Sequence, residues 1–240
     1  MKICLIIPPS SFLLDERVFM TLGILKVAAV LKQSGIQVEV LDLSGIKNFL
    51  DVIKDYMEQK TDVKYFGLTA TTPQLPPTIQ IAKTIHATCS DVKIILGGPH
   101  VTLVNVAYKK EVTSNRSGRA VEAMNQLISE FDVLVAGDGE EAIFIALKEE
   151  SPKIVDADKA GSELFLTDKK LTELPWPARE LIEVDSYHYS IEGVKAVSLI
   201  AQLGCPFPCG FCGGRSSDTF RKIRMRTSEN IIEEMLPWVL

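Results

Sequence analysis

A short stretch near the start of the chain, KICLII at Lys2 to Ile7, is apolar after its first residue and decides how the first part of the sequence is expected to fold. Short runs of this kind, rich in β-branched residues, are typical of strands in a parallel sheet that is covered on both faces. Similar runs recur up to residue 136, and the predicted strands are Lys2 to Ile7, Val38 to Leu43, Tyr65 to Ala70, Val92 to Leu96 and Asp132 to Ala136.

Helical patterns separate these strands, several of them with Gly or Ser just past the end. The predicted helices are about Val18 to Gln33, Ile46 to Gln59, Pro77 to Thr88, Gly118 to Glu130 and Gly139 to Glu149. Alternating strands and helices predict a doubly wound α/β domain, and a five-stranded unit most often has flavodoxin-like strand order. Ligands of such domains bind outside the carboxyl ends of the strands, so the loops after the strands carry the functional prediction.

The loop after the first strand, Pro8-Pro9-Ser10-Ser11-Phe12, contains no glycine. A dinucleotide-binding fold needs glycines there, because backbone N–H groups must approach a pyrophosphate. Two prolines remove two of those N–H donors. The loop therefore disfavours NAD binding.

Small and polar residues follow the third, fourth and fifth predicted strands. Hydroxyl side chains and glycines let a ligand approach the backbone closely, and acidic residues suit the first turn of a helix. Each of these features also has an ordinary structural explanation, as a tight turn, a local hydrogen bond or a helix cap. The candidate cofactor-binding residues in these loops are Thr69, Thr71, Gly97, Gly98, His100, Gly137 and Glu140.

Three cysteines lie close together near the end of the chain, at Cys205, Cys209 and Cys212. Closed structural zinc sites have four ligands, whereas an iron–sulfur cluster held by three thiolates keeps one iron open. The spacing therefore favours an iron–sulfur cluster with these three residues as metal ligands. A zinc site completed by His or Asp, and three thiols without a special role, are the alternatives.

The sequence changes character after residue 150. Residues 151–193 are rich in Lys, Asp and Pro and are expected to connect two domains. A short apolar run from Ala196 to Leu203 predicts a strand that carries the cysteine loop at its carboxyl end. After a basic run, Thr227 or Ser228 is expected to cap a helix. The expected division is a domain at 1–150, a linker at 151–193 and the start of a second domain at 194–240.

Composition excludes several classes of protein. The chain has 240 residues, 46% of them hydrophobic and 24% charged, and a net charge of −5, so we expect a soluble, mildly acidic protein. No apolar stretch is long enough to span a bilayer, and the N-terminus does not resemble a signal peptide, which favours a cytoplasmic location. The acidic balance gives no support to nucleic-acid binding.

Together these motifs resemble the N-terminal part of the radical S-adenosylmethionine (radical SAM) enzymes that carry a cobalamin (B12) binding domain. The resemblance rests on the Pro-Pro loop, the Leu22 to Leu31 run, Gly97 to Thr102, Gly137 to Glu141 and the cysteine motif. It implies that the loops after the third and fourth strands enclose the nucleotide tail of a corrinoid. The first loop has no Asp-x-His-x-x-Gly, so a histidine ligand to cobalt from that loop is excluded.

The resemblance also implies a chemistry. Cys205, Cys209 and Cys212 would hold a [4Fe-4S] cluster whose open iron binds S-adenosylmethionine and cleaves it to a 5′-deoxyadenosyl radical. Phe211 would shield the cluster. The family implies a small-molecule substrate, an external electron donor such as a flavodoxin or ferredoxin, and methyl transfer to an unactivated centre. No acid, base or nucleophile is predicted.

A complete barrel of the radical SAM type needs roughly 200 residues or more, and only its first strand, loop and helix are expected here. We therefore expect little or no turnover from this chain alone. Two other functions stay open: a corrinoid-binding module with a vestigial metal site, and a metal-binding α/β protein without cobalamin. The substrate, the choice between methylation, cyclisation and rearrangement, and the oligomeric state stay open as well.

Overall fold

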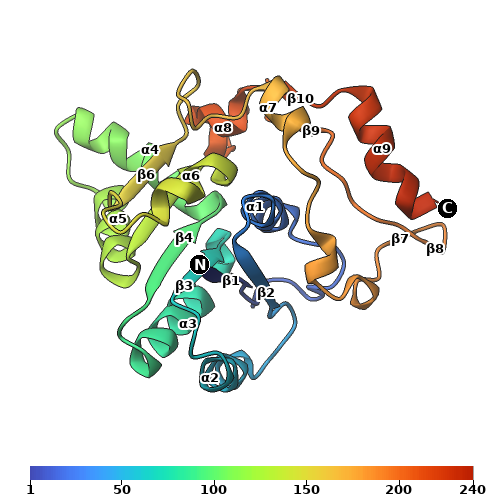
Figure 1. Cartoon of the computed structure of the whole chain (residues 1–240). Helices are drawn as coiled ribbons and strands as arrows, with labels where there is room; N and C mark the ends of the chain where they lie inside the picture. Colours follow the sequence, from blue (N-terminus) through green and yellow to red (C-terminus); the bar gives the residue numbers. More distant parts are fainter. Residues whose placement is uncertain (240) are drawn as a thin grey trace.

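A parallel six-stranded sheet forms the centre of the computed structural model, which describes residues 1–239 (Figure 1). The strand order is β2-β1-β3-β4-β5-β6. The strands are β1 (Lys2–Ile7), β2 (Gln37–Asp42), β3 (Tyr65–Thr69), β4 (Lys93–Gly97), β5 (Val133–Gly137) and β6 (Ile154–Ala157). The first five have the expected flavodoxin-like order, so the α/β prediction is confirmed and the predicted number of strands is corrected from five to six.

Helices connect the strands and cover both faces of the sheet (Figure 1). Those of the first part of the chain are α1 (Leu22–Gln33), α2 (Phe49–Gln59), α3 (Leu75–Thr88), α4 (Pro99–Thr113), α5 (Arg119–Glu130) and α6 (Gly139–Ala146). The remaining helices are α7 (Asp168–Glu173), α8 (Asp218–Arg221) and α9 (Ser228–Val239).

Alternation along β1 explains why the sheet needs two layers of helices. Ile3, Leu5 and Ile7 are buried against α1 and α6, whereas Cys4 and Ile6 are buried in the core formed with α2, α3, α4 and α5. Successive side chains of a strand point to opposite faces, so a wholly apolar strand is stable only when both faces are covered. The apolar stretch that opened the sequence therefore contributes to both cores.

The sequence prediction missed two elements of this domain. Helix α4 begins at Pro99, inside the region interpreted as a loop, because proline fits the first turn of a helix as well as a turn. Strand β6 lies in the stretch expected to be a linker and pairs with β5 at the edge of the sheet. It has four residues with alternating burial, a weaker signal than the apolar runs of the central strands.

The segment after β6 has little regular structure. Its strands are the two-residue pairs β7 (Ser190–Ile191) with β8 (Val194–Lys195) and β9 (Gln202–Leu203) with β10 (Arg224–Met225), both antiparallel. The strand expected over residues 196–203 is therefore limited to β9, and its partner in the described chain is not a parallel barrel strand. The helix expected after the basic run is α9, where the Thr227 hydroxyl oxygen accepts from the Asn230 backbone N–H at 3.3 Å.

Polar contacts attach this C-terminal segment to the sheet domain. Arg224 of β10 forms a buried ion pair with Asp138, which follows β5. The Asp158 carboxylate, just after β6, accepts from the Ser217 hydroxyl at 2.5 Å and from the Thr219 backbone N–H at 2.8 Å. These contacts place the start of α8 beside the carboxyl ends of β5 and β6.

Within the described residues, every helix is too short or too polar to cross a lipid bilayer.

Candidate cofactor-binding site

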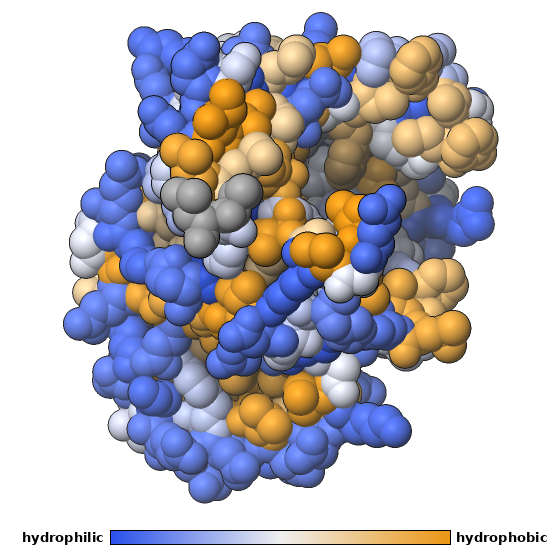
Figure 2. All heavy atoms as spheres, turned by 90° about the vertical axis from the view of Figure 1, so that its right-hand side faces the viewer, coloured by the Kyte–Doolittle hydropathy of each residue, from blue (hydrophilic) through white to orange (hydrophobic). Residues whose placement is uncertain are grey.

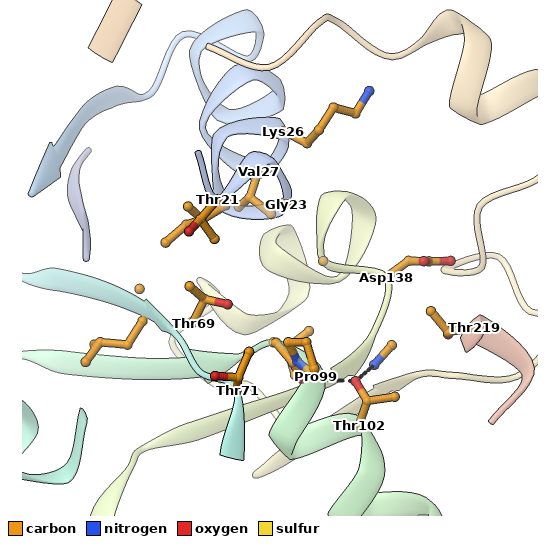
Figure 3. A pocket seen from close by; sticks show the side chains of 18 of the residues that line it. Thr21, Gly23, Lys26, Val27, Thr69, Thr71, Pro99, Thr102, Asp138 and Thr219 are labelled. Atoms are coloured by element: carbon orange, nitrogen blue, oxygen red, sulfur yellow. Dashed lines mark hydrogen bonds between the residues drawn. The ribbon is translucent and has the colours of Figure 1, made fainter. Parts of the chain in front are cut away.

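A cavity of about 620 Å³ lies at the carboxyl edge of the sheet, between the ends of β3, β4 and β5 and the first turns of α1 (Figure 3). This is the edge at which doubly wound sheets bind ligands, next to the switch point between β1 and β3. Apolar side chains and glycines form much of its wall, and a few polar groups interrupt them. Of the candidate cofactor-binding residues, the ones that line it are Thr69, Thr71, Gly97, Gly98, Gly137 and Glu140.

The two threonines after β3 differ in what their side chains do. The Thr71 hydroxyl donates to the Gln74 side-chain oxygen at 2.8 Å, and the Gln74 amide donates to the Pro8 carbonyl at 2.8 Å. Thr71 therefore caps the following turn, and Gln74 ties it to the first loop. Thr69 points into the cavity instead (Figure 3). Thr69 is the better placed of the two to contact a ligand.

The glycine pair after β4 also divides into two roles. A Cβ added to Gly98, whose φ is +95°, would lie 2.5 Å from the Thr69 hydroxyl and 2.8 Å from the Ala70 nitrogen. Gly98 is thus required for close packing of the two loops. A Cβ added to Gly97 would have ordinary contacts, the nearest at 3.8 Å. Gly97 therefore keeps the cavity open without being needed for the turn.

His100 is buried in the first turn of α4 and does not line the cavity. Its Nδ1 lies 3.0 Å from the Thr72 hydroxyl, and its backbone N–H donates to the Ala70 carbonyl at 3.0 Å. Burial lowers the pKa of His100 below its ordinary value, which favours the neutral ring. The structure therefore gives this candidate a structural role, holding α4 against the loop after β3.

Two acids with different surroundings follow β5. Asp138 points toward the C-terminal segment (Figure 3), pairs with Arg224 and accepts from the Leu166 backbone N–H at 2.9 Å. Burial raises its pKa, and the Arg224 charge opposes that shift. Glu140, in the first turn of α6, lines the cavity, and burial raises its pKa to about 7. Asp138 is thus used within the protein, whereas Glu140 is available at the cavity wall.

Several lining residues were missed at the sequence level. Lys26 of α1 is 3% exposed and donates from Nζ to the Pro175 carbonyl at 2.9 Å. A single lysine within the apolar stretch of α1 was the available signal, because lysine is rarely buried without a partner. Thr219 and Phe220 come from the C-terminal segment. Their sequence carries no such signal, because only the docking of that segment brings them to the cavity.

The cysteine loop lies outside the cavity, after β9. Gly204 has a φ of +83°, and an added Cβ would collide with the Lys222 backbone oxygen, so glycine is required where the loop begins. The Cys205 backbone N–H donates to the Phe220 carbonyl at 2.9 Å. Arg221 holds the next part of the loop, donating to the Pro206 carbonyl at 2.7 Å and to the Phe207 carbonyl.

The three thiols are of the type that binds iron, but the structure does not bring them together. Cys205 and Cys209 are exposed and Cys212 is half-buried, all as free thiols. Nowhere in residues 1–239 do three or more His, Cys, Asp or Glu side chains converge as a metal site would require. Phe211 is 95% exposed, so the expected shielding by this ring is not formed in this loop conformation. In this arrangement the loop does not fit a cluster.

The cavity does fit a large ligand that is apolar with a polar rim. It lies where the fold binds ligands, and its wall combines apolar side chains with the polar residues Thr69 and Glu140. A corrinoid has this chemistry, with an apolar face and amide groups around it. Thr69 and Gly97 line the cavity at the strand ends, and Glu140 lines it from the first turn of α6.

Comparison with known proteins also points to cobalamin as the ligand of this type of domain. Residues 16–113 match the B12 binding domain family. An uncharacterized methyltransferase of Pyrococcus horikoshii, PH0819, is 27% identical over 98% of this chain and 50% of its own length. The hopanoid C-3 methylase of Methylococcus capsulatus is 25% identical over 94% of this chain and 42% of its own. The chain thus spans half or less of the length of these curated relatives.

Solved structures share the fold. The radical SAM methyltransferase TsrM of Kitasatospora setae, with cobalamin and a [4Fe-4S] cluster bound, aligns over 98% of this chain and 45% of its own, with a TM-score of 0.61 and 15% identity. The cobalamin-dependent radical enzyme OxsB, with aqua-cobalamin and S-adenosylmethionine bound, aligns over 98% of this chain and 31% of its own, with a TM-score of 0.65 and 16% identity. Residues 16–113 thus match the B12 binding domain family, and the fold of the chain is similar to that of cobalamin-dependent radical SAM enzymes, as its motifs predicted.

Proposed function

We propose that this chain is the cobalamin-binding part of a cobalamin- and S-adenosylmethionine-dependent radical enzyme that transfers a methyl group to an unactivated centre of a small molecule. The observation that carries the proposal is the cavity at the carboxyl edge of the sheet, formed by loops within and beyond the part of the chain that matches the B12 binding domain. The methyltransferase relatives support the reaction class.

Within this proposal the chain's own residues have distinct tasks. Thr69 and Gly97 accept the ligand at the ends of β3 and β4, and α1 forms the opposite wall. Thr219 and Phe220 place the C-terminal segment against the same cavity, so the cysteine loop starts close to the corrinoid site. A bound corrinoid supplies the methyl-carrying cobalt, and the protein's contribution is to bind and orient it.

Cobalamin binding by the 240-residue chain tests the first half of the proposal. In equilibrium dialysis we expect the protein to bind about one cobalamin molecule per chain. Gly97→Leu is expected to abolish binding, because its side chain occupies the cavity while the backbone conformation suits any residue. Ala87→Leu adds the same side chain to the exposed surface of α3, away from the cavity, and is the matched control. Equal binding by both variants would contradict the assignment of the cavity.

Cys205, Cys209 and Cys212 are proposed to bind a [4Fe-4S] cluster, which would supply the electron for S-adenosylmethionine cleavage once an external flavodoxin or ferredoxin has reduced it. Because the thiols are apart in the structure, the proposal requires the loop to close when iron binds. Anaerobic reconstitution with iron and sulfide should give a brown protein, and replacing all three cysteines by serine should abolish this. Cys89→Ser is the matched control.

A second candidate function, a corrinoid-binding module without a cluster, is favoured by the same separation of the thiols. Retained cobalamin without uptake of iron would establish it and remove the cluster from the proposal. Uptake of zinc in place of iron would have the same consequence.

A further inference from the structure

Glu140 has an unusual position for an acid in a helix of a soluble domain. Acids in the first turn of a helix ordinarily face solvent, as its neighbour Glu141 does, where it lies 3.5 Å from the Lys170 Nζ. Glu140 is only 8% exposed, and the exposure that remains is toward the cavity it lines. A buried titratable group at a ligand site therefore requires an explanation.

The surroundings of Glu140 do not provide a strong partner for a carboxylate. The charged groups that face it are Lys26 of α1, Asp138 of its own turn and Arg224 of β10. Arg224 is paired with Asp138, and the Lys26 Nζ donates to the Pro175 carbonyl. The hydrogen bond that acts on the Glu140 carboxyl comes from its own backbone N–H.

Burial is therefore the dominant influence, and it favours the neutral acid. It raises the pKa of Glu140 to about 7, the Asp138 charge acts in the same direction, and Lys26 and Arg224 oppose the shift. Burial also lowers the pKa of Lys26, so the cation nearest in α1 is weakened by the same environment. Close to neutral pH, Glu140 can present a carboxyl O–H to the cavity, as an aspartate or glutamate of ordinary pKa cannot.

We propose that Glu140 binds the corrinoid as a protonated acid and donates its carboxyl proton in a hydrogen bond to a carbonyl oxygen of one of the amide groups at the rim of the ring. This inference rests on the proposed corrinoid binding and assigns one of its contacts. The Thr69 side chain, which points into the same cavity (Figure 3), supports a ligand with polar groups at its edge.

The protonated form is required because the ligand itself excludes water from the cavity. A carboxylate covered by the ring would lose its remaining hydration without gaining a cation, whereas the neutral acid gains an acceptor. Binding and protonation are thus coupled. The affinity is expected to be constant below the pKa of free Glu140 and to fall by up to about tenfold for each pH unit above it.

The test measures the dissociation constant of cyanocobalamin with the full chain at several values between about pH 6 and pH 8.5, by tryptophan fluorescence and equilibrium dialysis. We expect the affinity of the wild-type protein to fall about tenfold or more over the upper part of this range. Glu140→Gln keeps a neutral donor at every pH, so it should bind as the wild type does at pH 6 and show no dependence on pH. Glu140→Ala should bind weakly throughout.

Glu141→Gln is the matched control, because it removes a neighbouring acid of the same helix that does not line the cavity, and it should titrate as the wild type does. Circular dichroism at each pH confirms that the variants are folded. Wild-type binding that is independent of pH, or the same pH dependence in Glu140→Gln, would overturn the role of Glu140 and leave corrinoid binding intact. A wild-type protein that binds no cobalamin at any pH would overturn both.

Discussion

The sheet domain and the C-terminal segment of this chain are held in place by different kinds of interaction. In the sheet domain, apolar side chains of β1 to β6 are buried between two layers of helices. The segment after Ala157 adds apolar side chains such as Ala178 and Tyr187 to one of these cores, but it also contains several buried arginines. Large apolar side chains of α9 stay exposed (Figure 2), among them Ile232, Met235, Leu236 and Trp238.

The arginines of the C-terminal segment act as connections between distant stretches of chain. Glu234 of α9 lies between Arg179, at 2.7 Å, and Arg226, and all three are less than 8% exposed. Arg224 links Asp138 to β10 and lies over the Phe165 ring at 4.5 Å. Apolar burial is non-directional, whereas buried ion pairs require defined partners. The comparison therefore predicts that the two regions respond differently to substitution.

The largest effect is expected from truncating the core of the sheet domain. Phe66, the second residue of β3, is fully buried, so Phe66→Ala should lower the free energy of unfolding by about 3–5 kcal/mol. Urea denaturation followed by circular dichroism measures this change. Phe211→Ala removes the same ring from the cysteine loop, where it is 95% exposed, and should change stability by less than about 0.5 kcal/mol. Similar losses in both variants would refute the comparison.

Breaking one buried ion pair should release the C-terminal segment while the sheet stays folded. Arg224→Met leaves the Asp138 carboxylate buried without its cation. Removing one partner of a buried ion pair typically lowers the free energy of unfolding by about 3–5 kcal/mol. Hydrogen exchange is expected to accelerate in residues 217–226 and to stay slow in β1, β3 and β4. Adding Asp138→Asn to the Arg224→Met variant removes the unpaired charge and should restore part of the lost stability. Uniform acceleration across the sheet would show that the two regions unfold as one unit.

A smaller change is expected from Glu140, one of the two acids of the cavity wall whose pKa is raised. Because the pKa of Glu140 is about 7 in the folded protein and near 4.5 when unfolded, its ionisation opposes folding. The stability of the wild type should thus fall between pH 4.5 and pH 7, by up to about 3 kcal/mol. Glu140→Gln should remove this decline and be the more stable protein at pH 8. Urea midpoints measured from pH 5 to pH 8 check it, with Glu141→Gln as the control.

The smallest effect is expected at the surface of the C-terminal segment. Lys195 of β8 pairs with Asp185 at 2.5 Å, but both side chains are largely accessible to solvent. Exposed pairs contribute little because water and salt screen them. Lys195→Ala should leave the urea midpoint unchanged at physiological salt. A clear loss would show that surface charges also hold this segment in place.

The sequence predicted the sheet domain well because its signals are local and redundant. The five predicted strands lie within one residue of β1 to β5 at each end, since most of them are continuous apolar runs bounded by polar residues. The edge strand β6 and helix α4 were missed because neither has such a run, and their position depends on pairing with β5 and packing against α5.

The candidate site was predicted in part, for a related reason. Residues at the strand ends are placed by the fold, so Thr69, Gly97 and Glu140 could be found from the sequence and do line the cavity. His100 does not line the cavity, since its side chain is turned toward Thr72. Thr219 could not have been found, because it reaches the cavity only through the long-range contacts of Asp158 and Arg224.

Strand β6 has a consequence for anyone who dissects this protein. It shields the backbone N–H and C=O groups along one side of β5, through the pairs from Leu134 with Ile154 to Gly137 with Ala157. A recombinant fragment cut at residue 150, where the sequence suggests a boundary, would leave that apolar strand open to other chains and invite aggregation. A fragment that extends through Ala157 retains the cover, and its solubility would be the first sign that the boundary was chosen correctly.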